Sequence, residues 1–498
     1  MKKMNLWKKI VIAALSACIM APSVAASADS TVPYDSYNYD YWEDFVFTPA
    51  PYIPDHSISG TILGVGTFVN PQDLCVSPHG TVYIADTGNN RIVEVDNTLS
   101  NVIRVIDSFD NNGTTEKFSS PYGVCVSENH QIYIADSENH RIVVLEESDL
   151  SFVRFVENPT SEVLEEGFVF TPLKVTVDYA DRVYCIAKGM FEGIMVFEDG
   201  GQFTGFFGTI QVNISPWEKM WRRLSTKTQR SKQVLFIPTE FTGIDIDSDG
   251  FVYASNIDTQ GKQAVRRLNP KGEDVIKKGE NGNVGGDLAI VSTSSSNYAG
   301  ISMIIDVVYR DKGIYSLLDS KRGRIFTYDH EGNLLYIFGG LGAQAGTFTT
   351  PVAIEALDDK IVVLDATRRE MLVFKETQYG NLINEAVGLR YDGDETLAVD
   401  MWKQVLMLDE NNELANVGIG KAYLTSGDNV NAMKYLKIGM SRQYYSVAYR
   451  RYRNEFLKEY LGFILTGVVV IIAAIVLIKK HIKKKKGVYE EEGGAFDV

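Results

Sequence analysis

The chain has 498 residues, of which 45% are apolar and 23% charged, and its formal net charge is −15 at pH 7. This length allows two or three domains with their own cores, and the composition is ordinary for a folded protein. The two ends, 1–28 and 479–498, carry +4 and +2, so residues 29–478 carry −21. A surface this acidic repels phosphate backbones, which argues against nucleic acid as a partner and favours cationic or neutral partners.

Residues 1–28 have the pattern of a secretory signal peptide. Four lysines lie within the first nine residues, an apolar run follows over residues 10–21, and Ala26-Ser27-Ala28 offers small residues for cleavage. An alternative is that Leu15-Ser16-Ala17-Cys18 is a bacterial lipobox, which would place a lipid on Cys18. The signal-peptide interpretation places the following residues outside the cytoplasm.

Two segments fifty residues apart match almost position by position. The first reads Phe68-x-x-Pro71-x-x-x-Cys75-x-Ser77 and then Val82-Tyr83-Ile84-Ala85-Asp86. The second reads Phe118-x-x-Pro121-x-x-x-Cys125-x-Ser127 and then Ile132-Tyr133-Ile134-Ala135-Asp136. A period of about 40–50 residues with several short strands per unit indicates the blades of a β-propeller.

These two segments resemble the NHL repeat. The resemblance implies that each repeat is one four-stranded blade, commonly with six blades to a propeller. Weaker copies of the pattern extend the count to six, at Val183-Tyr184, Ile244–Ala254, Asp319–Phe326 and Val362–Phe374. The chain is therefore predicted to be mainly β, with a six-bladed NHL-type propeller over residues 57–376.

The predicted sixth blade has only three strands of its own, because helical sequence begins near residue 377. A sheet with a bare edge is a liability. The run 57–63, Ser-Ile-Ser-Gly-Thr-Ile-Leu, is predicted to supply the missing outer strand and close the ring. The extension before it, 29–56, contains an aromatic stretch over 34–52 that is predicted to lie against the outside of the propeller.

A basic insertion, 209–236, separates blades three and four. Ser215-Pro216-Trp217-Glu218 supplies an N-cap, a first-turn proline and a capping-box glutamate for a helix. Tryptophan and arginine often dominate interfaces. The candidate partner-binding residues are therefore Trp217, Trp221, Arg222 and Arg223. The alternative is a helix that packs on the propeller and leaves its basic face in water.

Charged pairs recur in the blades and are interpreted as structural, because a loop clip is needed once per blade and a ligand is not. The pairs are Asp86 with Arg91, Asp136 with Arg141, and Asp319 with Arg324. The run Asp245-x-Asp247-x-Asp249-Gly250 begins like a calcium loop, but Asn256 stands where the EF-hand pattern needs a glutamate. We interpret this run as a strand and its turn.

Three cysteines remain after the leader, which is an odd number and argues against a disulfide framework. Cys75, Cys125 and Cys185 are predicted to be small thiols in strands, in preference to a bridge. No pair of histidines has the spacing of metal ligands, and the sequence contains no Gly-x-Ser-x-Gly elbow, Walker loop or His-Glu-x-x-His. The sequence therefore predicts no catalytic residue, no metal and no cofactor.

Residues 377–460 change to a helical period, and a shift of 34 residues relates Asp394 to Asp428 and Ala398 to Ala432. This segment resembles TPR repeats across about two units. Each Gly-Asp pair is predicted to end one helix and cap the next. Because stable arrays usually need at least three repeats, the segment is expected to pack on the propeller, on the following helix or on a partner.

The uncharged run 461–478 is predicted to be a transmembrane helix. Its eighteen residues would extend about 27 Å, enough for the core of a bilayer. Six lysines lie within the next eight residues, and the positive-inside rule keeps them cytoplasmic. The sequence thus predicts a single-pass protein of the cell membrane, with residues 29–460 outside and the tail 479–498 inside.

These features favour a non-catalytic binding or scaffold protein. It would hold a protein partner or a surface glycan, for example as an accessory of a membrane transport complex. The alternative is a calcium-dependent hydrolase, because some six-bladed relatives are similar to lactonases that place Glu, Asn and Asp ligands around a central ion. Asp247, Asn256 and Asp306 are candidates in kind for such ligands.

Overall fold

The computed structural model describes residues 32–164, 167–209, 240–258, 263–278, 284–287 and 302–493. The chain divides into two compact units, residues 1–392 and 393–498, which are described separately below. The predicted signal peptide and residues 210–239 lie outside the described residues, and with them all but the first residue of the basic insertion.

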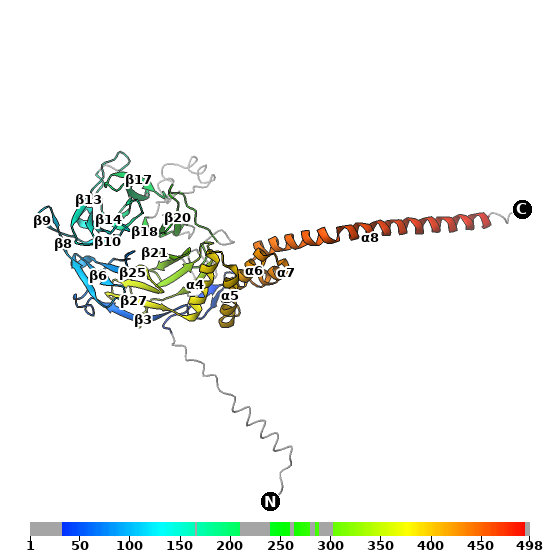
Figure 1. Ribbon diagram of the computed structural model, residues 1–498, viewed down its shortest axis with the longest axis horizontal. Helices are drawn as coiled ribbons and strands as arrows, with labels where there is room; N and C mark the ends of the chain where they lie inside the picture. Colours follow the sequence, from blue (N-terminus) through cyan, green and yellow to red (C-terminus); the bar gives the residue numbers. More distant parts are fainter. Residues whose placement is uncertain are drawn as a thin grey trace, which may run out of the picture. The chain divides into compact units, whose positions relative to one another are not determined.

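Six antiparallel sheets form the first unit and are arranged around a common centre (Figure 1). Blade one contains β4 (Asp73–Val76), β5 (Thr81–Asp86), β6 (Arg91–Asp96) and β7 (Val102–Ile106). Blade two contains β10 (Pro121–Val126), β11 (Gln131–Asp136), β12 (Arg141–Glu146) and β13 (Phe152–Val156). Blade three contains β14 (Pro172–Val177), β15 (Val183–Ala187), β16 (Ile194–Phe197) and β17 (Phe203–Phe207).

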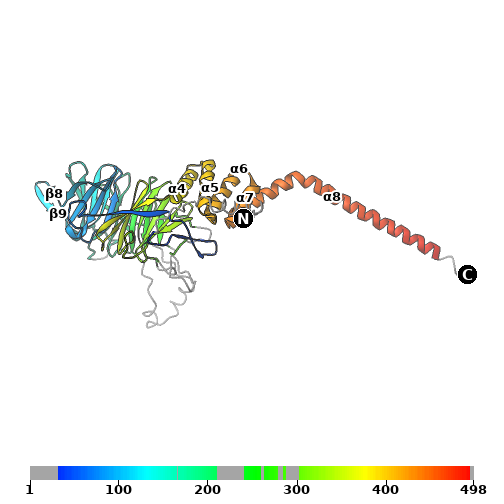
Figure 2. The same ribbon diagram turned by 90° about the horizontal axis from the view of Figure 1, so that it is seen from below.

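The remaining blades depart from this regular pattern. The described part of blade four contains β18 (Phe241–Ile246), β19 (Val252–Asn256) and β20 (Val265–Leu268). Blade five contains β21 (Ile304–Asp311), β22 (Ile314–Asp319), β23 (Arg324–Tyr328) and β24 (Leu334–Phe338). Blade six contains β25 (Pro351–Leu357), β26 (Lys360–Asp365) and β27 (Glu370–Glu376). A hairpin of β8 (Ser108–Asn111) and β9 (Thr114–Lys117) lies at the outer edge of the propeller in Figure 1 and Figure 2.

The ring closes by the predicted route. Strand β3 (Tyr52–Ser59) pairs antiparallel with β27, with Ile58 opposite Met371, and completes blade six as its outer strand (Figure 1). The strand begins five residues earlier than predicted and ends at Ser59. Residues 60–63 turn instead, because the Val65 N–H donates to the Gly60 carbonyl and the Leu63 N–H donates to Ser59.

The N-terminal extension is more than a cover for the outside of the propeller. Strands β1 (Tyr37–Tyr39) and β2 (Phe45–Phe47) extend the sheet of blade five beyond β24, to give six strands in the order β2-β1-β24-β23-β22-β21. The Tyr37 hydroxyl donates to Asp287 at 2.8 Å. The extension is therefore built into the sheet by backbone pairing, which the aromatic composition alone did not predict.

An aspartate at the end of the second strand clips the loop that enters the blade. The carboxylate accepts a backbone N–H at 2.5–2.8 Å in four blades: Asp86 from Val69, Asp136 from Ser119, Asp319 from Met303 and Asp365 from Thr349. The predicted arginine pairs are present in the first two blades, with Nε–Oδ2 distances of 2.7 Å and 3.0 Å. In blade five, Arg324 lies opposite Asp319 in register, but it donates to Asp287 and Tyr37. A contact with the N-terminal extension thus replaces the predicted arginine pairing there.

Five helices follow the propeller. The first, α4 (Gln378–Tyr391), belongs to the first unit and is capped by the Thr377 hydroxyl, which accepts from the Gly380 N–H at 3.3 Å. The second unit contains α5 (Glu395–Leu408), α6 (Glu413–Ser426), α7 (Asn429–Ile438) and α8 (Arg442–Gly493).

The predicted Gly-Asp boundaries are confirmed. Gly393 and Gly427 have positive φ, and the Asp394 and Asp428 carboxylates accept from the N–H groups three residues later. A methyl group at Gly418 would collide with the Trp402 indole, so a small residue lets α5 and α6 approach. The further resemblance to TPR units stays a prediction.

Helix α8 contains the predicted transmembrane run. Residues 442–484 form a helix that is long and apolar enough to cross a membrane, and the side chains of its apolar window are not buried. The residues that precede the uncharged run and the run 461–478 itself are parts of this one helix. It is a candidate span, compatible with a single-pass membrane protein.

Candidate functional site: an acidic cavity on the propeller axis

The first strand of every blade presents two inward positions that form two rings across the six blades. Strand pairing aligns these positions between blades. The first ring contains Asp73, Gly123, Lys174, Gly243, Asp306 and Ala353. The second ring, two residues further along each strand, contains Cys75, Cys125, Thr176, Asp245, Val308 and Glu355.

A buried charged triad crosses the first ring. The Lys174 ammonium forms an ion pair with Asp73 and lies 3.5 Å from Asp306 Oδ2. Backbone N–H groups hold the two carboxylates in turn. The Val124 N–H donates to Asp73 at 3.1 Å, and the Ile354 N–H donates to Asp306 at 3.0 Å. The triad comes from blades one, three and five and is tied to blades two and six, so it connects five of the six sheets.

Glycines alternate with the charged residues of this ring because nothing larger fits. A Cβ at Gly243 would collide with the carboxylate and Cα of Asp306, and a Cβ at Gly123 would collide with the backbone of Leu173 and Lys174. The alternation of large charged and minimal residues therefore allows the triad to meet on the axis.

The pKa values of the triad follow from burial and mutual attraction. Burial alone would lower the pKa of Lys174, but the carboxylates of Asp306 and Asp73 raise it above its ordinary value. Burial raises the pKa of Asp306 to about 6 and also raises the pKa of Asp73, although Lys174 opposes both shifts. One ammonium thus faces two carboxylates, and the triad carries at most one excess negative charge.

The second ring adds two carboxyl groups, and no basic side chain of the described part of the chain forms an ion pair with either. Burial raises the pKa of Asp245 to about 7, against the effect of the Tyr309 and Ile246 N–H groups, which donate to it at 2.6 Å and 2.8 Å. Burial also raises the pKa of Glu355 well above its ordinary value, and the nearby charges of Asp245 and Asp306 raise it further. Burial therefore raises the pKa of both carboxyl groups of this ring.

The thiols of the second ring belong to Cys75 and Cys125, and both are free. A hydrogen bond with Cys125, together with burial, raises the pKa of the Cys75 thiol. Cys185 is also free and fully buried in β15, away from the cavity. The two ring thiols are useful reporters, because they line the same space as Asp245 and Glu355.

The rings enclose a cavity of about 440 Å³ that reaches from the triad to the turns after the first strands. Among the described residues, its lining includes eight acidic residues and two basic ones, Lys174 and Arg310. Two of the acids are neutralised from outside the lining, since Arg182 forms an ion pair with Asp178 and Arg267 forms one with Asp247, both at 2.6 Å. The remaining excess of carboxyl groups makes the cavity suited to a cationic group.

The structure separates the residues proposed as calcium ligands. Asp306 and Asp247 line the cavity, but Asn256 does not, and its amide donates to the Gln263 carbonyl at 2.6 Å. Asp247 accepts from the N–H groups of Asp249 and Phe251, so the calcium-like run is the predicted strand and turn. The candidate docking residues Trp217, Trp221, Arg222 and Arg223 lie outside the described residues.

Several site residues were missed in the sequence. Asp73, Lys174, Asp245 and Glu355 occur at inward strand positions, and Lys174 meets Asp73 and Asp306 across 101 and 132 residues. Aligning all six blades by their first strands would have shown these residues at two shared positions. The turns of blades one and two also bring His79, His130 and Glu147 together, which linear spacing did not predict.

Replacing Glu355 with glutamine is expected to change how stability depends on pH. Because folding raises the pKa of Glu355, the folded protein loses stability as the pH rises above the ordinary carboxyl value near 4.5. Glutamine has no such proton to lose. Unfolding of the full chain in detergent should show E355Q matching the native protein near pH 5 and exceeding it by at least about 1 kcal/mol near pH 8. The same change at exposed Glu385 should show no such trend.

The NHL repeat model matches residues 68–94 and 118–145, and no curated protein matches the sequence. A streptogramin B lyase structure is similar at 11% identity and a TM-score of 0.40, over 65% of this chain and 97% of that chain. A virginiamycin B lyase structure from Staphylococcus aureus is similar at 12% identity and a TM-score of 0.37, over 68% of this chain and 87% of that chain. The Kuenenia stuttgartiensis hydrazine synthase is similar at 11% identity and a TM-score of 0.39, over 63% of this chain and 97% of that chain. Residues 68–94 and 118–145 are thus NHL repeats, and they supply the first two blades of this six-bladed propeller.

Proposed function

We propose that this chain is a membrane-tethered, extracytoplasmic binding protein whose propeller takes a cationic group of a protein partner into the axial cavity. The observation that carries the proposal is the cavity itself, about 440 Å³ in volume and lined by an excess of carboxyl groups. A lysine or arginine side chain or an amine fits this volume and supplies the charge that Asp245 and Glu355 lack. A neutral glycan would leave both groups without a counter-charge.

The tether belongs to the same proposal. Helix α8 would cross the membrane, with the lysines from 479 to 486 on the cytoplasmic side and the propeller outside. Helices α5 to α7, which belong to the segment that resembles TPR repeats, would offer a second surface for the same partner or another. A component of a membrane transport complex is the kind of partner this arrangement suits.

The alternative of a calcium-dependent hydrolase is less well supported by the geometry. An ion on the axis at the first ring would meet the Lys174 ammonium, which already lies between two of the carboxylates. Two positive groups this close repel strongly in a buried site. A binding role does not require the lysine to move, because the second ring lies beyond it.

The proposal is tested by binding of tri-lysine and tri-glutamine to the full chain in nanodiscs, measured by calorimetry. Tri-lysine should bind with one site per chain, and tri-glutamine should not. Affinity should rise from pH 5 to pH 8, as Asp306 and Asp245 ionise near 6 and 7. E355Q should weaken binding about tenfold.

Glu385 provides the matched control, because E385Q removes the same charge from an exposed position on α4. It should leave tri-lysine binding unchanged. Equal binding of the two peptides, or equal losses from E355Q and E385Q, would show that the cavity is not the binding site.

A further inference from the structure

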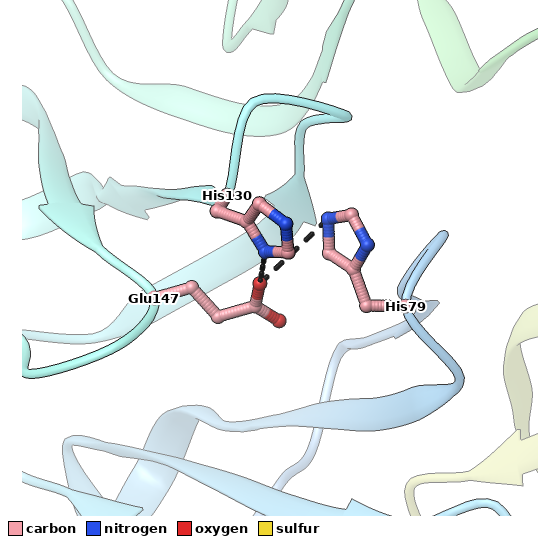
Figure 3. A group of neighbouring side chains, drawn as sticks. All are labelled: His79, His130 and Glu147. Carbon is pink, nitrogen blue, oxygen red and sulfur yellow. Dashed lines mark hydrogen bonds and ion pairs between the residues drawn. The ribbon is translucent and has the colours of Figure 1, made fainter.

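A second polar cluster lies where two neighbouring blades meet (Figure 3). His79 is on the turn between β4 and β5 of blade one, and His130 is on the corresponding turn between β10 and β11 of blade two. Glu147 directly follows β12. The two histidines are 51 residues apart in the chain, close to the repeat length of fifty, and adjacent blades therefore place them side by side.

The nitrogen atoms of both rings converge on one carboxylate oxygen. His130 Nδ1 lies 2.6 Å from Glu147 Oε2, and His79 Nε2 lies 3.7 Å from the same atom. The rings stack, with centroids 3.6 Å apart and planes 15° apart. The three ligand atoms all lie within 4.8 Å of one another.

Surrounding contacts hold this arrangement. The other oxygen of Glu147 accepts from the Tyr83 hydroxyl at 3.2 Å and the Ser77 hydroxyl at 3.5 Å, which leaves Oε2 facing the histidines. The Glu147 N–H donates to the His130 carbonyl at 2.8 Å, so a backbone hydrogen bond joins the two residues directly. The Ser77 hydroxyl also accepts from the His79 N–H at 3.1 Å. Such outer contacts orient ligands in metal sites.

Hydrogen bonds alone give a competing explanation. His130 can donate to Glu147, and His79 Nε2 lies 3.3 Å from the Ser127 carbonyl, to which it can donate. In that case the two histidines are a stacked, hydrogen-bonded pair. A metal would instead take His79 Nε2 away from Ser127. The two explanations therefore differ in the partner of His79 Nε2, which is the Ser127 carbonyl oxygen in one and the metal ion in the other.

We propose that His79, His130 and Glu147 form a binding site for Zn²⁺ or a similar divalent transition-metal ion. Two imidazoles and one carboxylate suit zinc, with bonds of about 2.0–2.2 Å that put the ligand atoms of a tetrahedral centre about 3.3 Å apart. To reach that spacing, the two nearly parallel rings would have to rotate out of their stack so that both nitrogen lone pairs point at the ion. Three protein ligands leave a fourth position for water or for a group from a partner.

The position of the site gives it two consequences. The ion ties the turn of blade one to blade two, and it stabilises the folded chain by an amount that rises with the logarithm of its concentration. The site also adjoins the mouth of the axial cavity, because Pro78 and Ser127 line that cavity. The side chains of His79 and His130 are 24% and 62% exposed, so an ion has access from solvent.

The test uses the full chain in nanodiscs, purified without a histidine tag and stripped with a chelator. ZnCl₂ is titrated against a competing chromophoric chelator, and CoCl₂ is added separately to record its visible spectrum. The native protein should bind one zinc ion per chain and give the intense bands of four-coordinate cobalt. H79N and H130N should each weaken zinc binding by more than about 100-fold, and Y83F by about tenfold. Asparagine is chosen because it tolerates the left-handed backbone of His130.

His56 provides the matched control, since it is exposed on β3 and lies outside the cluster. H56N should bind zinc as the native protein does. Hydrogen-bonded histidines without a metal site would give the same weak zinc affinity for the native protein, H79N and H56N, and a six-coordinate cobalt spectrum. Either result would overturn the proposal, and neither depends on whether the axial cavity binds tri-lysine.

Discussion

Replacing Lys174 with methionine is expected to lower the free energy of unfolding by about 3–5 kcal/mol. The change keeps a long side chain but leaves Asp73 and Asp306 as buried carboxylates that face each other without a cation. The loss should be larger near pH 8 than near pH 5, because protonation of the carboxyl groups relieves the repulsion and the pKa of Asp306 is already about 6. Chemical unfolding of the full chain in detergent measures it.

Two further variants show whether charge is the cause. Adding D73N and D306N to K174M should recover most of the lost stability, because an apolar and amide centre needs no counter-ion. Lys188 is exposed in the same blade, and K188M should change stability by less than about 0.5 kcal/mol. If K174M were as harmless as K188M, the triad would not be a structural element of the axis.

The second large effect concerns closure of the ring. Ile58 is 3% exposed and packs from β3 into the core that blades one and six share. I58A should therefore cost about 2–5 kcal/mol, the usual loss for a buried large-to-small change. Thermal unfolding in detergent should show the whole propeller melting earlier in one transition, because the strand holds the first blade to the last.

Ile62 offers the comparison four residues away, since it is 70% exposed in the turn after β3. I62A should alter the free energy of unfolding by less than about 0.5 kcal/mol. Equal effects from I58A and I62A, or an early transition confined to part of the propeller, would contradict closure by β3.

The sequence predicted those parts of the fold that depend on local patterns or on repetition. The fifty-residue match around Asp86 and Asp136 identified the blades, because each blade repeats the same strand lengths and the same loop clip. Because blade six had only three strands of its own in the sequence, the segment that contains Ile58 was predicted to supply the fourth. The Gly-Asp pairs marked helix ends, because left-handed glycine and aspartate caps are local signals.

Features that depend on contacts across the ring were not predicted. Lys174 meets Asp73 and Asp306 only after six sheets have closed, and a single strand shows no sign of this. His79 and His130 were passed over because metal motifs were sought at short linear spacing, whereas adjacent blades join positions one repeat apart. Arg324 does not pair with Asp319 as predicted, because strand β1 places the Tyr37 hydroxyl beside it. The pairing of β1 with the sheet is made by backbone hydrogen bonds, which have a weak sequence signature.

The charge of the cavity can be measured directly with its own thiols, Cys75 and Cys125, by comparing a cationic with an anionic methanethiosulfonate reagent on the full chain in nanodiscs. A variant with serine at both positions provides the blank. The cationic reagent should react several times faster than the anionic one, and E355Q and added salt should both reduce the ratio. An anionic reagent that reacts as fast as the cationic one, or faster, would contradict an axial cavity that attracts cationic groups.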